Sequence, residues 1–118
     1  MTLKTDYFDG LTGLHTKMND AFDAGTAFVV TNSVTLSTDL KSAAEQGKTK
    51  FDVSYLTSFN PTWLRGNNAD NLLRKSYFAG IIKGLSDGDI YSHEVALVLD
   101  VSDSLTTKVK FMFNFQTT

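Results

Sequence analysis

The most regular hydrophobic pattern of this chain lies near its end, over residues 89–115. Apolar residues alternate with polar ones on both sides of a polar segment, and the apolar positions are Tyr91, Val95, Leu97, Leu99 and Val101, then Val109, Phe111, Phe113 and Phe115. Because successive side chains of a strand point to opposite faces, this alternation predicts a β-hairpin with one strongly apolar face. The connection, residues 102–107, is longer than a tight two-residue turn, so the pattern predicts the pairing but leaves the register open.

Two segments in the first half of the chain carry apolar residues three and four positions apart, which is typical of amphipathic helices. The first helix is predicted over residues 5–23, with Gly25 at its C-terminal cap. The second is predicted over residues 37–46, and Gly47 occupies the position favoured for its C-terminal cap.

A third helix is predicted over residues 71–85, where the apolar residues spread over most of the helix surface. We expect it to be the most buried helix. Its two glycines, Gly80 and Gly84, lie four positions apart and would allow a neighbouring element to pack closely.

Residues 48–57 alternate between apolar and polar and predict a half-buried strand. Residues 26–36 are apolar and β-branched without clean alternation, and we predict a short edge strand there. Residues 58–71 contain the single Pro and the single Trp of the chain and predict an irregular connection, a kind of segment that often carries function.

The order of these elements predicts one domain of the α+β class, because 118 residues suffice for one core and are too few for two ordinary domains. The strand–helix–strand unit over residues 51–101 should cross over right-handed, which makes its two strands parallel. We place the last strand, the most aromatic, between them and antiparallel to both. The expected fold is three helices on the Phe-rich face of a three- to four-stranded, mixed but mainly antiparallel sheet that ends in a C-terminal β-hairpin.

Composition narrows the function classes only slightly. Eleven Lys and Arg stand against 13 Asp and Glu, a balance that disfavours binding to nucleic acid or to anionic membranes. The absence of cysteine excludes disulfides, thiolate nucleophiles and cysteine-ligated metals. No apolar run has the length of a signal peptide or of a membrane span, so we expect a soluble protein made in the cytoplasm.

No motif predicts a catalytic residue, a metal or a cofactor. The two histidines, His15 and His93, lack the helical spacing of a zinc site. Residues 86–89 resemble part of a calcium loop but lack its later ligands, so a turn is the better interpretation. There is no nucleophile elbow and no glycine-rich phosphate loop.

Four lysines fall on the polar side of the predicted strands, and they form the main charged feature. They could make a platform for anions or nucleic acid, or they could simply keep the sheet soluble and protect its edges. The second interpretation is favoured, because acidic residues share that side and no aromatic side chain is interleaved. The lysines are Lys48, Lys50, Lys108 and Lys110, and the acidic residues are Asp52, Glu94 and Asp100.

Two groups of residues are candidates for an interaction site. Phe59, Trp63 and Arg65, with Leu64 between them, have the composition of an interface hot spot, although the aromatic pair could equally cap the core. The second group lies on the polar face of the hairpin, where an apolar centre has a polar rim, as in an interface. Its apolar members are Ile90, Ala96, Val98 and Met112. The alternative is that the first helix or residues 26–36 cover this face within one chain.

These observations favour a non-enzymatic structural or assembly protein that forms a homo-oligomer, such as a small phage or virion component. An alternative is a small-molecule enzyme or binding domain whose pocket is closed by residues 60–71. A third hypothesis, nucleic-acid binding through the lysine-bearing face, has the least support.

Overall fold

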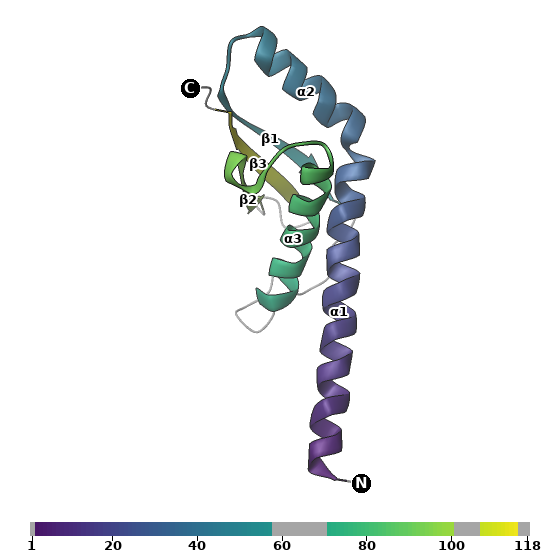
Figure 1. Ribbon diagram of the computed structural model, residues 1–118. Coiled ribbons are helices and arrows are strands. Elements are labelled where there is room, and N and C mark those ends of the chain that lie inside the picture. The colour runs from purple at the N-terminus through teal and green to yellow at the C-terminus, as the bar shows by residue number, and fades with distance from the viewer. Residues whose placement is uncertain (1, 58–70, 101–106, 116–118) are drawn as a thin grey trace.

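The computed structural model describes residues 2–57, 71–100 and 107–115, and it confirms the α+β class (Figure 1). Within these residues the fold has three α-helices, one short 3-10 helix and three strands. In chain order they are α1 (Leu3–Thr31), α2 (Ser33–Glu45), β1 (Lys50–Leu56), α3 (Asn71–Asp87), η3 (Ser92–Glu94), β2 (Val95–Asp100) and β3 (Lys108–Asn114).

The strands form a sheet in the order β1-β3-β2, and β3 is antiparallel to both neighbours. This confirms the predicted central place of the last strand, and it makes β1 and β2 parallel to each other. In the register, Phe113 lies opposite Phe51 on one side and opposite Val95 on the other. The β2–β3 connection predicted at residues 102–107 lies almost wholly outside the described residues, and within those residues both strand pairs are antiparallel and no fourth strand occurs.

The strand predicted over residues 26–36 is wrong, because this segment is helical. Helix α1 continues to Thr31, and α2 begins at Ser33 instead of Ser37. Asn32 separates the two helices, and its Nδ2 donates to the carbonyl oxygen of Phe28 at 2.8 Å. The β-branched residues favour a strand locally, but helical spacing buries Phe28, Val29 and Leu36 together, and this burial outweighs the small difference in propensity.

The C-terminal cap predicted at Gly25 is wrong. Gly25 lies buried in the second half of α1, where α1 and α3 pack closely. A Cβ atom on Gly25 would collide with the carbonyl oxygen of Tyr77, and one on Gly80 would collide with that of Phe22. Thr26 Oγ1 also donates to the carbonyl oxygen of Gly80 at 3.1 Å. The close approach predicted from the glycines of α3 is therefore confirmed, and the two helices run side by side in the same direction (Figure 1).

The C-terminal cap predicted at Gly47 is confirmed. Gly47 has a φ of 72°, a conformation that glycine adopts without steric cost. Its N–H donates to the carbonyl oxygen of Ala44, and the N–H of Lys48 donates to that of Ala43, each at 3.0 Å. This pair of hydrogen bonds is a Schellman motif, and it turns the chain from α2 into β1.

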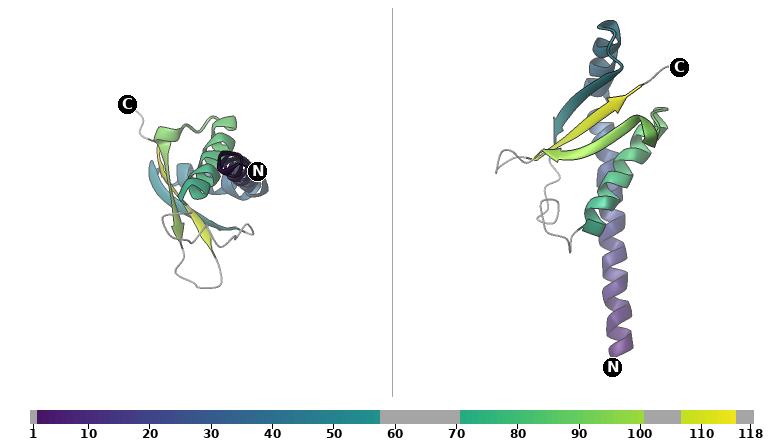
Figure 2. Two further views of the ribbon diagram at one scale, coloured as in Figure 1. Left: turned by 90° about the horizontal axis from the view of Figure 1, so that it is seen from below. Right: turned by 90° about the vertical axis from the view of Figure 1, so that its left-hand side faces the viewer.

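The core lies between the helices and the aromatic face of the sheet, and all three helices lie on that side (Figure 2). Phe111 is fully buried and packs edge-on against Phe28 of α1, with ring centroids 6.1 Å apart, and against Tyr55 of β1, at 5.6 Å. Tyr77 of α3 is also fully buried, and its hydroxyl lies 3.1 Å from that of Thr57. These contacts confirm in part the prediction that the helices cover the Phe-rich face. No helix in the described part of the chain is long and apolar enough to cross a membrane.

Candidate interaction surfaces

Most of the large apolar side chains that remain exposed in the described structure fall into three regions. One is the beginning of α1, the second is the junction of α1 and α2, and the third is the sheet face that points away from the helices. In that order, the side chains are Leu3, Tyr7 and Phe8; Val30 and Val34; and Leu56, Val98 and Met112.

The first region projects from the body of the molecule. Helix α3 begins about halfway along α1, so residues 3–14, which we call the arm, extend beyond it (Figure 1). At 1.5 Å per residue the arm is about 18 Å long. Its apolar residues recur at helical spacing on one side, and they are Leu3, Tyr7, Phe8, Leu11 and Leu14. Tyr7 is 65% exposed and Leu3 is 84% exposed.

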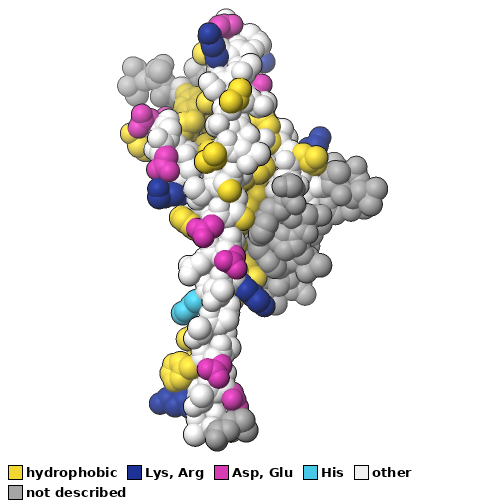
Figure 3. Space-filling view, turned by 90° about the vertical axis from the view of Figure 1, so that its right-hand side faces the viewer, with side chains coloured by type: hydrophobic (Ala, Val, Ile, Leu, Met, Phe, Trp, Pro, Cys, Tyr) yellow, Lys and Arg dark blue, Asp and Glu magenta, His cyan; other side chains and the backbone are white. Residues whose placement is uncertain are grey.

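Charge is distributed unevenly around the arm. Lys4 falls within the apolar side, and its Nζ lies 6.0 Å from the centre of the Phe8 ring. At 3.6 residues per turn Asp9 falls on the opposite side of the helix, and Asp6 falls on the flank next to Leu3. Figure 3 shows an apolar ring next to a basic side chain on this part of α1, with acidic side chains farther around the helix.

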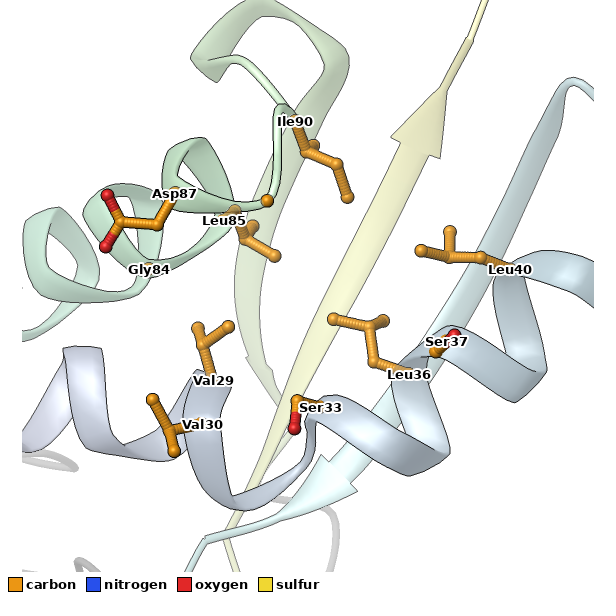
Figure 4. Close-up of a pocket in the computed structure, with 11 residues that line it drawn as sticks. Val29, Val30, Ser33, Leu36, Ser37, Leu40, Gly84, Leu85, Asp87 and Ile90 are labelled. Carbon is orange, nitrogen blue, oxygen red and sulfur yellow. The ribbon is translucent and has the colours of Figure 1, made fainter.

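The second region is an apolar groove between α2 and the end of α3 (Figure 4). Leu36 and Leu40 of α2 point toward Leu85 and Ile90 across a space of about 450 Å³. Asp87 stands at the edge and is the only charged residue among those that line this space. A second hollow of about 400 Å³ shares Leu40, Gly88 and Ile90 with the first and continues it toward Phe51 and Phe115.

The third region contains two residues that the sequence indicated for an interface, Val98 and Met112. They are 45% and 39% exposed on the outer face of the sheet, the face opposite the helices. Neither α1 nor residues 26–36 cover this face, so the intrachain alternative is wrong for the described residues (Figure 2). Ile90 was predicted there too, and that prediction is wrong: it precedes η3 and packs against the core on the helix side.

The four lysines do not form a cluster. Lys50 pairs with Asn114 at one end of the sheet and Lys108 pairs with Leu56 at the other, about 20 Å away at the rise of a strand. Between them, Lys110 makes an ion pair with Asp52 at 3.5 Å. Because the lysines are dispersed, they do not form a continuous basic surface for an anionic ligand.

Two tyrosine hydroxyls make hydrogen bonds that connect elements of the fold. The hydroxyl of Tyr55 donates to Asp39 Oδ2 at 2.6 Å and ties β1 to α2. Desolvation, and then the hydrogen bond to Asp39 and its charge, raise the pKa of Tyr55 far above its ordinary value. Burial also raises the pKa of Tyr77.

The histidines stay apart from any set of metal ligands in the part of the chain that the structure describes. His15 is exposed on α1, and His93 stacks on Tyr91 with ring centroids 6.2 Å apart. Residues 2–57, 71–100 and 107–115 hold no group of three His, Cys, Asp or Glu side chains that could bind a metal ion. The remaining candidates, Phe59, Trp63 and Arg65, lie outside the described residues.

Sequence reasoning missed the groove, because its lining comes from α1, α2, α3 and the segment that follows α3. It also ended α1 too early. One signal was present: the spacing of Leu11, Leu14 and Met18 continues through Ala21 to Phe28, which predicts a single long helix.

Comparisons of the chain with protein-family models, with curated proteins and with solved structures found no significant match.

Proposed function

We propose that this chain is a non-enzymatic structural protein that assembles with copies of itself. The class includes small components of phages and other virions. The observation that carries the proposal is the arm, a helical segment with an apolar side that no described element covers.

The energetics of a short helix support a partner for the arm. Helices shorter than about 12–15 residues are marginal in water, and each glycine within one costs about 1 kcal/mol relative to alanine. The arm has 12 residues and contains Gly10 and Gly13. Attachment to the rest of α1 removes the cost of nucleation, but it does not cover the apolar side. Burial of Tyr7, Leu11 and Leu14 against another chain would stabilise the arm as a helix.

The outer face of the sheet supports the same proposal, because it offers a second surface for contact with another chain. Val98 and Met112 form an apolar centre, and Lys110, Asp52 and Asn114 surround it. An apolar centre with a polar rim is the usual anatomy of a protein interface.

Light scattering after size exclusion tests self-association. We expect a mass above the 13.0 kDa of one chain, and we expect it to fall to 13.0 kDa for Leu11→Asp. Thr12→Asp, on the polar side of the arm, is the matched control and should leave the mass unchanged. Val98→Lys and Met112→Lys test the sheet face in the same way. A wild-type chain that stays at 13.0 kDa up to high micromolar concentration would refute the proposal.

A further inference from the structure

We propose that the groove between α2 and the end of α3 receives the arm of a second copy of this chain. This inference rests on the proposed function, since it names the surface through which self-assembly occurs. It is distinct from a pairing of two arms and from a contact between two sheet faces.

The groove and the arm are complementary in shape and polarity. The groove is open, and Leu36, Leu40, Leu85 and Ile90 make it apolar (Figure 4). Val30, which also lines the groove, is 68% exposed. The arm offers apolar side chains at intervals of three and four, the pattern with which an amphipathic helix fills such a groove.

A chain cannot place its arm in its own groove. Both belong to α1, because Val29 and Val30 near the end of this helix line the groove, while the arm is its first 12 residues. The 29 residues of α1 form one continuous helix about 43 Å long, which keeps the two regions at opposite ends. The arm that fills the groove must therefore come from another copy.

The electrostatics of the two regions are also complementary. Helices α1 and α3 both end at the groove, and neither has a basic residue in its last turn. The carbonyl end of α3 makes its part of the rim partly negative. The carboxylate of Asp87 adds little to this charge, because Lys83 Nζ pairs with it at 3.0 Å, and the carbonyl end of α1 meets the N-terminus of α2 at Asn32. The arm presents Lys4 on its apolar side, together with the positive end of the α1 dipole. Asp9 lies on the opposite side of the arm, and Asp6 lies in the first turn of α1.

Two variants that each damage one partner of the contact test this arrangement. Leu11→Asp damages the arm, and Ser37→Arg places a long cation at the lining of the groove without altering a buried side chain. Each variant alone should be monomeric by light scattering. Their equimolar mixture should recover a species of twice the mass of one chain, because the intact arm of one variant fits the intact groove of the other.

The outcomes separate this inference from the proposed function. If Ser37→Arg keeps the wild-type mass while Leu11→Asp is monomeric, self-assembly stands and the groove is not its receptor. If both variants are monomeric and do not combine, the inference is also overturned. A monomeric wild type overturns both proposals. Thr35→Arg, on the exposed side of α2, is the matched control for folding and should keep both the wild-type mass and the melting temperature.

Cross-linking gives an independent measurement, because the chain contains no cysteine of its own. A Tyr7→Cys chain mixed with a Val30→Cys chain should form a heterodimer with a short bis-maleimide. Preferential cross-linking of Tyr7→Cys to itself would indicate pairing between arms and would contradict the inference. Mixing Tyr7→Cys with Val98→Cys, on the sheet face, should give only background.

Discussion

The two halves of α1 carry the same apolar periodicity but differ in what covers them. In the second half, Ala21 and Phe28 are 0% and 7% exposed, because α3 and the sheet pack against them. In the first half, Leu3 and Tyr7 are 84% and 65% exposed. Helical spacing thus indicates which side of a helix is apolar, but it does not indicate which element, or which molecule, buries that side.

The glycines of α1 also differ between its two halves in what surrounds them. Gly25 lies where the backbones of α1 and α3 approach closely, and no side chain would fit there without a shift of one helix. Gly10 and Gly13 have no atom within 4 Å of an added Cβ. One residue type therefore allows close packing in the second half of the helix and only weakens the helix in the first.

We call the part of the molecule outside the arm the body. Removal of an aromatic ring should give the largest difference between the body and the arm in the free energy of unfolding. Phe113 is 2% exposed, so Phe113→Ala should lower the free energy of unfolding by about 3–5 kcal/mol and is expected to impair folding. Phe8→Ala, on the arm, should lower it by less than about 0.5 kcal/mol. Urea titration of monomeric protein measures both values, and equal losses would mean that the arm belongs to the core.

The control for the strand assignment is Lys110→Ala, on the outer face next to Phe111. Its ion pair with Asp52 is partly exposed, so the loss should stay within about 0–1 kcal/mol. A loss comparable to that of Phe113→Ala would show that the two faces of β3 are assigned the wrong way round.

The sheet could be predicted from sequence and the groove could not, whereas the extent of α1 was indicated only by the helical spacing that continues to Phe28. Alternation at Val109, Phe111 and Phe113 has a period that only a strand satisfies, and the placement of β3 between its neighbours followed from its aromatic content. At Val29 and Val30, by contrast, local preference favours a strand, and only contacts with residues more than 50 positions away, such as Gly84, select the helix. The groove depends on several contacts of this long-range kind, because four segments of the chain line it.

The second prediction tests the close approach of the helices. Gly25→Ala should destabilise the body by about 1–3 kcal/mol or more, because the new methyl group would meet backbone atoms of α3 instead of a flexible side chain. Thermal melts of Gly25→Ala and Gly13→Ala give the comparison. A neutral Gly25→Ala would mean that α1 and α3 are farther apart than the structure places them.

The third prediction concerns alkaline pH and the hydrogen bond that joins β1 to α2. The pKa of Tyr55 is raised in the folded state, so the unfolded chain releases this proton first, near pH 10. The stabilisation from the protonated Tyr55 hydroxyl is therefore complete below pH 10, and it decreases as the pH rises above 10. Tyr55→Phe should lower the free energy of unfolding by about 1 kcal/mol at pH 8, and its difference from the wild type should disappear as the pH rises above 10. Tyr7→Phe, on the arm, is the control, and urea midpoints from pH 8 to 11.5 test the difference.

The smallest effect is expected from the glycines of the arm. Gly10→Ala and Gly13→Ala should each stabilise the local helix by about 1 kcal/mol, which is about a fivefold increase in the protection of arm amides against hydrogen exchange. The urea midpoint of the body should hardly change, because the added methyl groups touch nothing. Exchange measured on the monomeric Ser37→Arg variant isolates this local effect from assembly. If the body midpoint rose with the protection of the arm, the two halves of α1 would unfold as one unit, and the difference between them would concern exposure alone.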